Sequence, residues 1–314
     1  MTLALQEASL HIGRTAPNPP VGATALGAGG ILLATGAHEQ PGTPHAEVVV
    51  LDRCRAENIQ VDTLVVTLEP CNHFGRTPPC TDAIIAAGVR RVIYGVRDPN
   101  PRVAGGGIEK LLAHGIVVEQ IDASKRDECD ILIQPFRKRI TTGRPFVTVK
   151  TAHLPGGSMI PPFGRKTFTS PASIRFAHEL RKRSDAIITG SGTVLADDPL
   201  FTVRAVADHP DKKRLLVIFD RRKRITPAWE AAASSRGFEI IRHDDIEAAL
   251  DDLGSRGCLE VLVEGGPSLA QSFLLQGLWD RHVRIEQGRS ALEPDIIRTV
   301  LPTAGTETAP AASV

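Results

Sequence analysis

The sequence predicts an α/β protein made of two successive domains, covering residues 1–145 and 146–314. The length of 314 residues is typical of two domains rather than one. Short β-branched runs alternate with helical patterns, which favours sheets covered by layers of helices. A charged, helical stretch at 122–139 is followed by the turn residues 141–145, where we place the boundary.

Glycines and turn residues delimit the elements expected in the first domain. Gly13 closes a mixed apolar pattern, Gly27–Gly30 indicates the turn of a hairpin, and Val48–Leu51 indicates the buried face of a helix. Thr63–Leu68 is a β-branched run typical of a buried strand. The expected order is helix 2–12, hairpin strands 21–26 and 31–35, helix 45–58, strand 63–68, helix 80–87, strand 91–96, helix 107–114 and strand 116–121.

The second domain is expected to be another α/β unit, because strand and helix patterns alternate there as well. Its last twelve residues, 303–314, are small and polar, so we expect them to be disordered. The expected order is strand 146–151, helix 171–183, strands 185–189, 214–219 and 238–242, helix 244–253, strand 259–263, helix 267–276 and strand 281–286.

Composition excludes several classes of function. The net charge of +1 and the aromatic content of 4% argue against binding to nucleic acid, and no apolar run reaches the length of a membrane span. The first residues lack the pattern of a signal peptide, so we expect a cytoplasmic protein. In a reducing compartment, a close cysteine pair is more often metal-binding or catalytic than disulfide-bonded.

His45, Glu47, Cys71 and Cys80 carry the clearest chemistry in the chain. One imidazole and two thiolates are suitable zinc ligands, and a site with three protein ligands leaves a position for water, whose pKa then falls to about 7. Glu47 can take the proton of that water and later protonate a departing ammonia. Each residue alone has a structural explanation, as a surface histidine, a helix-start charge or a buried thiol. Together, with His45, Glu47 and Cys80 at expected helix starts, they predict a zinc-dependent deaminase.

The spacing of the cysteines narrows this interpretation. Eight residues separate Cys71 from Cys80, where the usual zinc-deaminase signature has two. With this insertion, the segments Pro17-Asn18-Pro19, His45-Ala46-Glu47, 69–80 and Asp98-Pro99-Asn100-Pro101 resemble the deaminase domain of the bifunctional riboflavin-biosynthesis deaminase/reductase family.

This resemblance implies a three-layer cytidine-deaminase-like first domain with a phosphorylated diaminopyrimidine, 2,5-diamino-6-(5-phosphoribosylamino)pyrimidin-4(3H)-one, as its substrate. By position, His45, Cys71 and Cys80 match the zinc ligands and Glu47 the proton shuttle. Asn18 matches a substrate-binding residue, although a turn asparagine between prolines explains it equally well. His73 and Arg76 are candidates for contacts to the base and phosphate, with loop solvation as the alternative.

The second domain carries a glycine turn between a strand and a helix, at Val263–Ala270, which is a suitable phosphate site. With Thr189–Pro199 and Thr202–Arg204, this turn resembles the family's reductase domain, which is dihydrofolate-reductase-like and uses NADPH to reduce the ribose. The implied substrate-binding residues are Arg181, Arg204 and Glu264. The implied cofactor-binding residues are Thr193, Asp197, Gly265, Gly266, Pro267 and Ser268.

Four departures from the family set the second domain apart. His153 stands where a small residue is expected to face the cofactor, and a nearby aspartate is absent; Phe168-Thr169-Ser170 lacks the usual tryptophan; Arg221 replaces a serine; and residues 285–314 match poorly and stop early. Losing terminal strands would expose a sheet edge. We therefore predict zinc-dependent deamination with weak or absent NADPH-dependent reduction, in a second domain that serves as a scaffold or as a module for homodimerisation.

Four alternatives stay open at this point. The chain can be a full bifunctional enzyme of riboflavin synthesis, or a paralogue that deaminates the same intermediate for a secondary metabolite. A nucleic-acid editing deaminase would give the basic run Arg221–Arg224 a role, although runs this short are usually solvated. A purely structural zinc protein would keep the metal without turnover.

Overall fold

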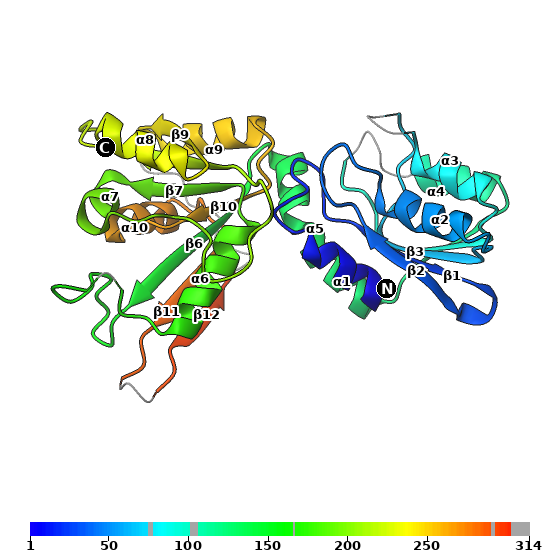
Figure 1. The fold of residues 1–314 in the computed structure, drawn as a ribbon, viewed down its shortest axis with the longest axis horizontal. Helices are drawn as coiled ribbons and strands as arrows, with labels where there is room; N and C mark the ends of the chain where they lie inside the picture. Colours follow the sequence, from blue (N-terminus) through cyan, green and yellow to red (C-terminus); the bar gives the residue numbers. More distant parts are fainter. Residues whose placement is uncertain (75–77, 101–105, 166, 290–292, 303–314) are drawn as a thin grey trace, which may run out of the picture. The chain divides into compact units, whose positions relative to one another are not determined.

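The computed structural model describes residues 1–74, 78–100, 106–165, 167–289 and 293–302. The chain divides into two compact units (Figure 1). The first contains Met1–Phe146 together with Leu250–Glu260, and the second contains Val147–Ala249 and the chain from Val261 onward. Each unit is built around one sheet.

The sheet of the first unit has the strand order β2-β1-β3-β4-β5. Its central strand, β3, consists of six buried residues, as expected for a β-branched run covered on both faces. β1 pairs antiparallel with β2 and β3, whereas β3, β4 and β5 run parallel. The strands are β1 (Gly22–Leu26), β2 (Leu32–Ala37), β3 (Thr63–Leu68), β4 (Arg91–Val96) and β5 (Val117–Gln120).

Helices cover both faces of this sheet and give the three layers that were expected (Figure 1). On one face, α2 contacts α3 and α3 contacts α4; on the other, α1 contacts α5. The helices are α1 (Thr2–Leu10), α2 (Ala46–Ala56), α3 (Cys80–Ala86), α4 (Gly106–Ala113) and α5 (Ala123–Thr142).

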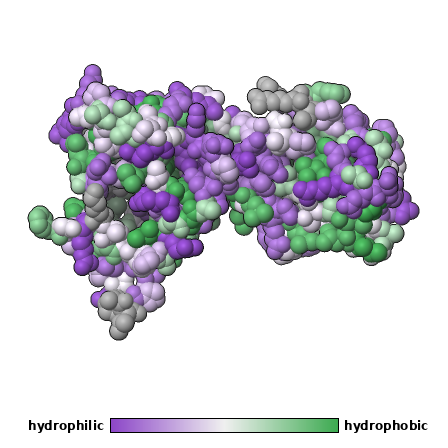
Figure 2. Space-filling model, viewed as in Figure 1, coloured by the Kyte–Doolittle hydropathy of each residue, from purple (hydrophilic) through white to green (hydrophobic). Residues whose placement is uncertain are grey.

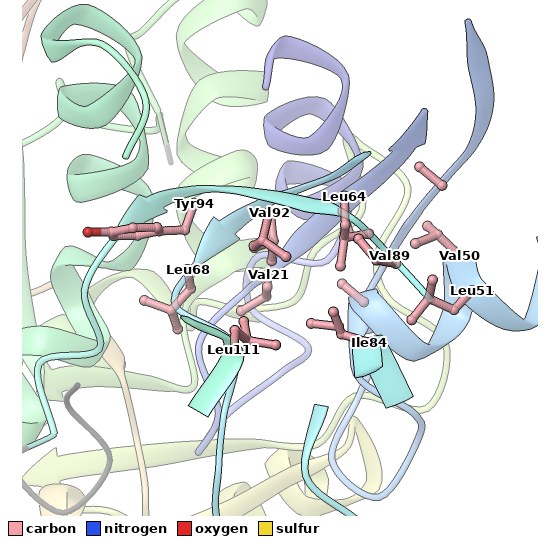
Figure 3. Close-up of a cluster of buried hydrophobic side chains, with 14 of the residues drawn as sticks. Val21, Val50, Leu51, Leu64, Leu68, Ile84, Val89, Val92, Tyr94 and Leu111 are labelled. Carbon is pink, nitrogen blue, oxygen red and sulfur yellow. The ribbon is translucent and has the colours of Figure 1, made fainter. Parts of the chain in front are cut away.

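Apolar side chains from the sheet and from α2, α3 and α4 form one core (Figure 3). Leu64 and Val92 are fully buried on the strands, and Ile84 and Leu111 are fully buried on α3 and α4. Gly22 fixes how α1 packs on β1, because a Cβ atom there would lie 1.9 Å from the carbonyl oxygen of Ala4. The core thus holds the starts of α2 and α3 beside the end of β3.

The sheet of the second unit has the strand order β12-β11-β6-β10-β7-β8-β9. β11 pairs with β6 in parallel. The pairs β10–β7, β7–β8 and β8–β9 are parallel as well. The strands are β6 (Phe146–His153), β7 (Ala186–Gly190), β8 (Arg214–Phe219), β9 (Phe238–His243), β10 (Glu260–Val263), β11 (Arg281–Glu286) and β12 (Ile296–Val300). The helices are α6 (Pro171–Arg183), α7 (Ser191–Asp197), α8 (Pro227–Ser235), α9 (Ile246–Ser255) and α10 (Pro267–Leu275).

The structure adds three elements that the sequence analysis did not predict, namely α7, α8 and β12. β12 corrects the expectation that the sheet ends after residue 286, because it pairs antiparallel with β11 from Glu286 to His282. The Asp295 carboxylate, just before β12, accepts hydrogen bonds from the backbone N–H groups of Ser170 and Gly288. The predicted disorder at 303–314 lies outside the described residues.

Hydrophilic residues make up much of the visible surface (Figure 2). Within the described part of the chain, none of the helices combines the length and the apolar character needed to cross a membrane.

Candidate active site

Three potential metal ligands meet at the carboxyl end of β3. His45 is the N-cap residue of α2, Cys71 follows β3, and Cys80 is the first residue of α3. His45 Nδ1 lies 3.2 Å from Cys80 Sγ and 3.5 Å from Cys71 Sγ, and the three ligand atoms lie within 4.8 Å of one another. Among the described residues, this is the one group of this kind found with metal-ligand geometry.

Two backbone N–H groups at the start of α3 hold Cys71 beside Cys80. The backbone N–H of Cys80 donates to Cys71 Sγ over 3.4 Å, and the N–H of Thr81 donates to the carbonyl of Cys71 over 3.2 Å. The positive ends of the helix dipoles favour thiolates here. The hydrogen bond from the Cys80 thiol, followed by that from His45, lowers the pKa of Cys71 to about 4. The hydrogen bond to Cys71 in turn raises the pKa of His45 to about 8.

This donor set is suitable for zinc. One imidazole nitrogen and two sulfurs are ligand types that zinc prefers, and three protein ligands are the number found in catalytic sites. Cys71 is ready to bind a cation as a thiolate, and none of the five cysteines forms a disulfide. The zinc ligands named from the sequence are therefore brought together by the fold.

Glu47 lies in the first turn of α2, with only 3% of its surface exposed. Burial raises the pKa of its carboxyl group, and the charge of His45 opposes that shift. A carboxyl group with a raised pKa holds a proton more readily than an ordinary glutamate does, which suits a general acid or base.

These residues open onto a cavity of about 420 Å³. It is lined by loop residues around 17–21, 38–47, 68–73 and 98–100 and by Phe136, Arg139 and Ile140 of α5. Among the residues named from the sequence, Asn18, His45, Glu47, Cys71 and His73 line it. Arg76 lies outside the described residues.

His38 fixes the orientation of Asn18. The Pro44 carbonyl can only accept a hydrogen bond, so His38 Nδ1, at 3.2 Å, must donate to it. Burial lowers the pKa of His38, which leaves the ring neutral and its Nε2 an acceptor. Asn18 Nδ2 therefore donates to His38 Nε2 over 3.1 Å, and its Oδ1 is the atom available to a ligand.

Sequence reasoning assigned no role to several residues that line this cavity. Asp98 and Asn100 belong to a segment that carried the resemblance, and their place in a loop after a strand was a usable signal. Glu69 likewise belongs to such a segment, 69–80, whereas His38 and Arg139 had no motif or spacing to mark them. They join the site through the fold alone.

The second unit contains a buried ion cluster at the end of β10. Glu264, whose side chain is 5% exposed, binds Arg181 Nε over 2.6 Å and Lys150 Nζ over 3.1 Å. Burial alone would raise the pKa of Glu264, but the two cations outweigh it and lower the pKa to about 2. Burial and the nearby guanidinium of Arg181 lower the pKa of His178 to about 4, and its Nδ1 accepts from the backbone N–H of Arg204 over 2.8 Å.

This cluster lies on a second cavity, of about 430 Å³. Most of the residues named for the cofactor and substrate line it, namely Arg181, Thr193, Asp197, Arg204, Glu264, Gly265 and Gly266. Thr193 Oγ1 accepts the N–H of Gly266 over 2.8 Å, so the loop is held against α7. Pro267 and Ser268 are exposed and do not line the cavity.

His153 does not line this second cavity. Successive residues of a strand point to opposite faces, and it is Lys150 and Ala152 that line the cavity. The His153 ring bonds Thr151 Oγ1 over 3.0 Å and the Gly157 carbonyl over 3.0 Å instead. Phe168 does line the cavity, in the place where the missing tryptophan was noted.

Two protein families match the chain, one on each half. The cytidine and deoxycytidylate deaminase zinc-binding region matches residues 1–96, and the RibD C-terminal domain matches residues 145–285. The riboflavin biosynthesis protein RibD of Aquifex aeolicus is 37% identical over 304 residues, spanning 90% of this chain and 84% of that protein. RibD of Escherichia coli is 37% identical over 313 residues, spanning 89% of this chain and 84% of that protein.

Solved structures are similar over nearly the whole chain. A diaminohydroxyphosphoribosylaminopyrimidine deaminase/5-amino-6-(5-phosphoribosylamino)uracil reductase from Thermotoga maritima superposes with a TM-score of 0.81 and 32% identity. The match covers 94% of this chain and 87% of that one. RibD of Acinetobacter baumannii superposes with a TM-score of 0.79 and 30% identity, covering 93% of this chain and 86% of that one.

Proposed function

The chain belongs to the RibD family of bifunctional riboflavin-biosynthesis deaminase/reductases, and from this premise we propose how its residues divide the work. The first unit is a zinc-dependent deaminase of the family's pyrimidine intermediate, 2,5-diamino-6-(5-phosphoribosylamino)pyrimidin-4(3H)-one. One observation carries this assignment, namely that His45, Cys71 and Cys80 meet, and that His45 and Cys71 line one cavity together with the buried Glu47.

His45, Cys71 and Cys80 would hold the zinc ion, which when bound supplies an activated water as the nucleophile. The carboxylate of Glu47 takes a proton from that water and passes it to a ring nitrogen of the pyrimidine. The carboxylate then takes the proton of the hydroxyl group newly bonded to the ring carbon and delivers it to the departing amino group, so that carbon gains a carbonyl oxygen and ammonia leaves. Burial excludes bulk water from Glu47, so the proton stays with the reacting groups.

Asn18 positions the ring in this scheme. Because His38 holds its amide nitrogen, Asn18 presents its oxygen, which accepts an N–H or amino group of the substrate. His73, which is exposed on the rim of the cavity, is a candidate for contacts to the outer part of the substrate.

Isotope labelling of the water tests the deaminase assignment directly. The zinc-loaded protein should release ammonia and place one labelled oxygen on the pyrimidine. A Glu47→Gln protein should keep the metal and lose the turnover. Ammonia release at the wild-type rate by the Glu47→Gln protein would contradict the assigned proton transfer.

A second function, NADPH-dependent reduction of the ribose, is favoured by the second cavity. Its cation–carboxylate cluster is complete, Thr193 holds the loop at Gly266, and the small residue Ala152 faces the cavity. This supports the full bifunctional alternative over the weak or absent reduction predicted from the departures. Incubating the protein with the deaminated product and NADPH, and following the mass of that product, separates the bifunctional enzyme from one without reductase activity. Only reduction adds hydrogen to the ribose. A paralogue serving a secondary metabolite would fail to complement a strain that lacks the normal enzyme.

We further propose that the second unit mediates assembly into a homodimer or higher homo-oligomer. β12 forms a sheet edge on which Ile296, Ile297 and Val300 are exposed, and such an edge can pair with another chain. Light scattering on the purified protein checks this. The two thiol ligands require a reducing environment, which supports the cytoplasm as the place of action.

A further inference from the structure

Arg139 is the one lysine or arginine among the described residues that line the deaminase cavity. It lies in the last turn of α5, beside Phe136 and Ile140. The other ionisable groups of the lining are the metal-site residues, three carboxylates and two further histidines. Arg139 is therefore the principal fixed positive charge of this wall.

One contact anchors the Arg139 side chain and leaves its far end available. Its Nε donates to the carbonyl of Gly254 over 3.0 Å. Among the described residues, neither terminal nitrogen of Arg139 has a hydrogen bond or an ion-pair partner. Gly254 packs closely against the backbone of Gly143, because a Cβ atom there would lie 1.8 Å from the carbonyl oxygen of Gly143. The anchor thus fixes the direction of the guanidinium while its two terminal amino groups remain free.

The charges that line the cavity indicate what the free end of the Arg139 side chain can bind. Glu47, Glu69 and Asp98 bring carboxylates to the lining, and a substrate that carries a phosphate adds further negative charge. Because the lining carries this excess of carboxylates, a cation is needed at the place where the phosphate binds. A guanidinium bound through Nε alone retains the paired N–H donors that match two oxygens of a phosphate.

We propose that Arg139 binds the phosphate of the deaminase substrate and so positions the pyrimidine over the metal site. This inference rests on the proposed deaminase function, since it concerns the substrate of that cavity. Arg139 acts on binding and touches none of the reacting atoms. A purely structural Arg139, which only caps the carbonyl of Gly254, would affect stability and would not distinguish phosphorylated from unphosphorylated ligands.

The test compares the phosphorylated pyrimidine with its phosphatase-treated counterpart. The Arg139→Gln protein should lose roughly 10- to 100-fold in kcat/KM on the phosphorylated substrate, mostly through KM. On the dephosphorylated substrate, the kcat/KM of the Arg139→Gln protein should equal that of the wild type. Inorganic phosphate should inhibit the wild type and not this variant. An Arg139→Lys protein, which keeps the charge and loses the fork, should fall between them.

Arg137 provides a matched control on the same helix. It pairs with Asp130 and does not line the cavity, so an Arg137→Gln protein should behave as the wild type on both substrates. For each protein, the ratio of kcat/KM on the phosphorylated substrate to kcat/KM on the dephosphorylated one is the quantity compared. A fraction of misfolded protein lowers both values equally and leaves this ratio unchanged. An equal loss on both substrates, or no loss on either, would overturn the role of Arg139.

Equilibrium binding separates this inference from the proposed function. In a Glu47→Gln background, calorimetry measures the affinity for both ligands without turnover. Adding Arg139→Gln should abolish the preference for the phosphorylated ligand. A wild-type protein that releases no ammonia would refute the deaminase assignment, whereas an unchanged binding preference would refute only the role of Arg139.

Discussion

Replacing Glu264 by glutamine should remove a pH-dependent part of the stability of the second unit. The Glu264 carboxylate is bound by Arg181 through Nε at 2.6 Å and Nη2 at 3.1 Å, and by Lys150 at 3.1 Å. Glutamine has nearly the same shape as a protonated glutamate, so the variant imitates the wild type at low pH. At neutral pH it leaves two partly buried cations without their partner, which is destabilising.

The size of the effect follows from the pKa of Glu264. Its ordinary value is 4.5, and in the folded protein it is about 2. A pKa lowered on folding stabilises the protein above the unfolded value, and the stabilisation is lost as the pH falls from 4.5 toward about 2. The shift corresponds to about 3 kcal/mol at pH 7, of which roughly 2 kcal/mol is lost by about pH 3.

Urea unfolding followed by tryptophan fluorescence measures this effect. Both tryptophans of the chain, Trp229 and Trp279, lie in the second unit, so their emission reports on that unit. The difference in unfolding free energy between wild type and Glu264→Gln should shrink by roughly 2 kcal/mol between about pH 7 and about pH 3. Glu179, exposed on α6, provides a control whose glutamine variant should follow the wild type throughout. A difference that stays constant over this range would refute the assigned ion cluster.

Three further predictions concern the two cavities. A Cys71→Ser protein should lose bound zinc and deamination together, measured by metal analysis and ammonia release, while its tryptophan emission stays that of the wild type. A His38→Ala protein should keep its zinc but lose roughly 2- to 12-fold in deamination kcat/KM, because the amide of Asn18 is no longer held; an unchanged kcat/KM would argue against this link. In the second unit, Ala152→Leu should fill part of the cavity and abolish any NADPH oxidation, whereas His153→Ala should leave its rate unaltered because that ring lies on the other face.

Short stretches of sequence were sufficient to predict elements and site residues whose structure depends on neighbouring residues in the chain. Thr63–Leu68 was predicted as a strand because a continuous β-branched run is the mark of burial on both faces, and all six residues are buried. The metal ligands were found because helix starts and the Cys71–Cys80 spacing are visible in the chain itself. His38 and Arg139 reach the same cavity from distant segments, and no periodicity links them to it.

Other misses have separate physical causes. α7 contains Gly192 and ends at Asp197, which are weak helix formers, and Arg224 donates to the hydroxyl of its first residue, Ser191, from a distant loop. The run Ile296–Val300 is mostly β-branched, so the local signal for β12 is present in the sequence, although this end of the chain matches the family pattern poorly. β6 is largely buried on both faces, and a strand of that kind does not reveal which alternate residues line a given cavity; Lys150 and Ala152 do so, and His153 does not.

The position of β6 in its sheet has a consequence for the synthesis of the protein. β6 is the first strand of its sheet to leave the ribosome, yet its neighbours are β10 and β11. About 110 residues separate it from the end of β10, so at 5–20 residues per second it waits roughly 5–20 s for a partner. Throughout that interval Val147 and Val149, both fully buried in the finished protein, have no strand to pair with. Pulse proteolysis of stalled chains should find this segment cleavable until β10 is complete. The nascent second unit therefore exposes an apolar strand without its neighbours at a stage when the strands β1 to β5 of the first sheet have already been made.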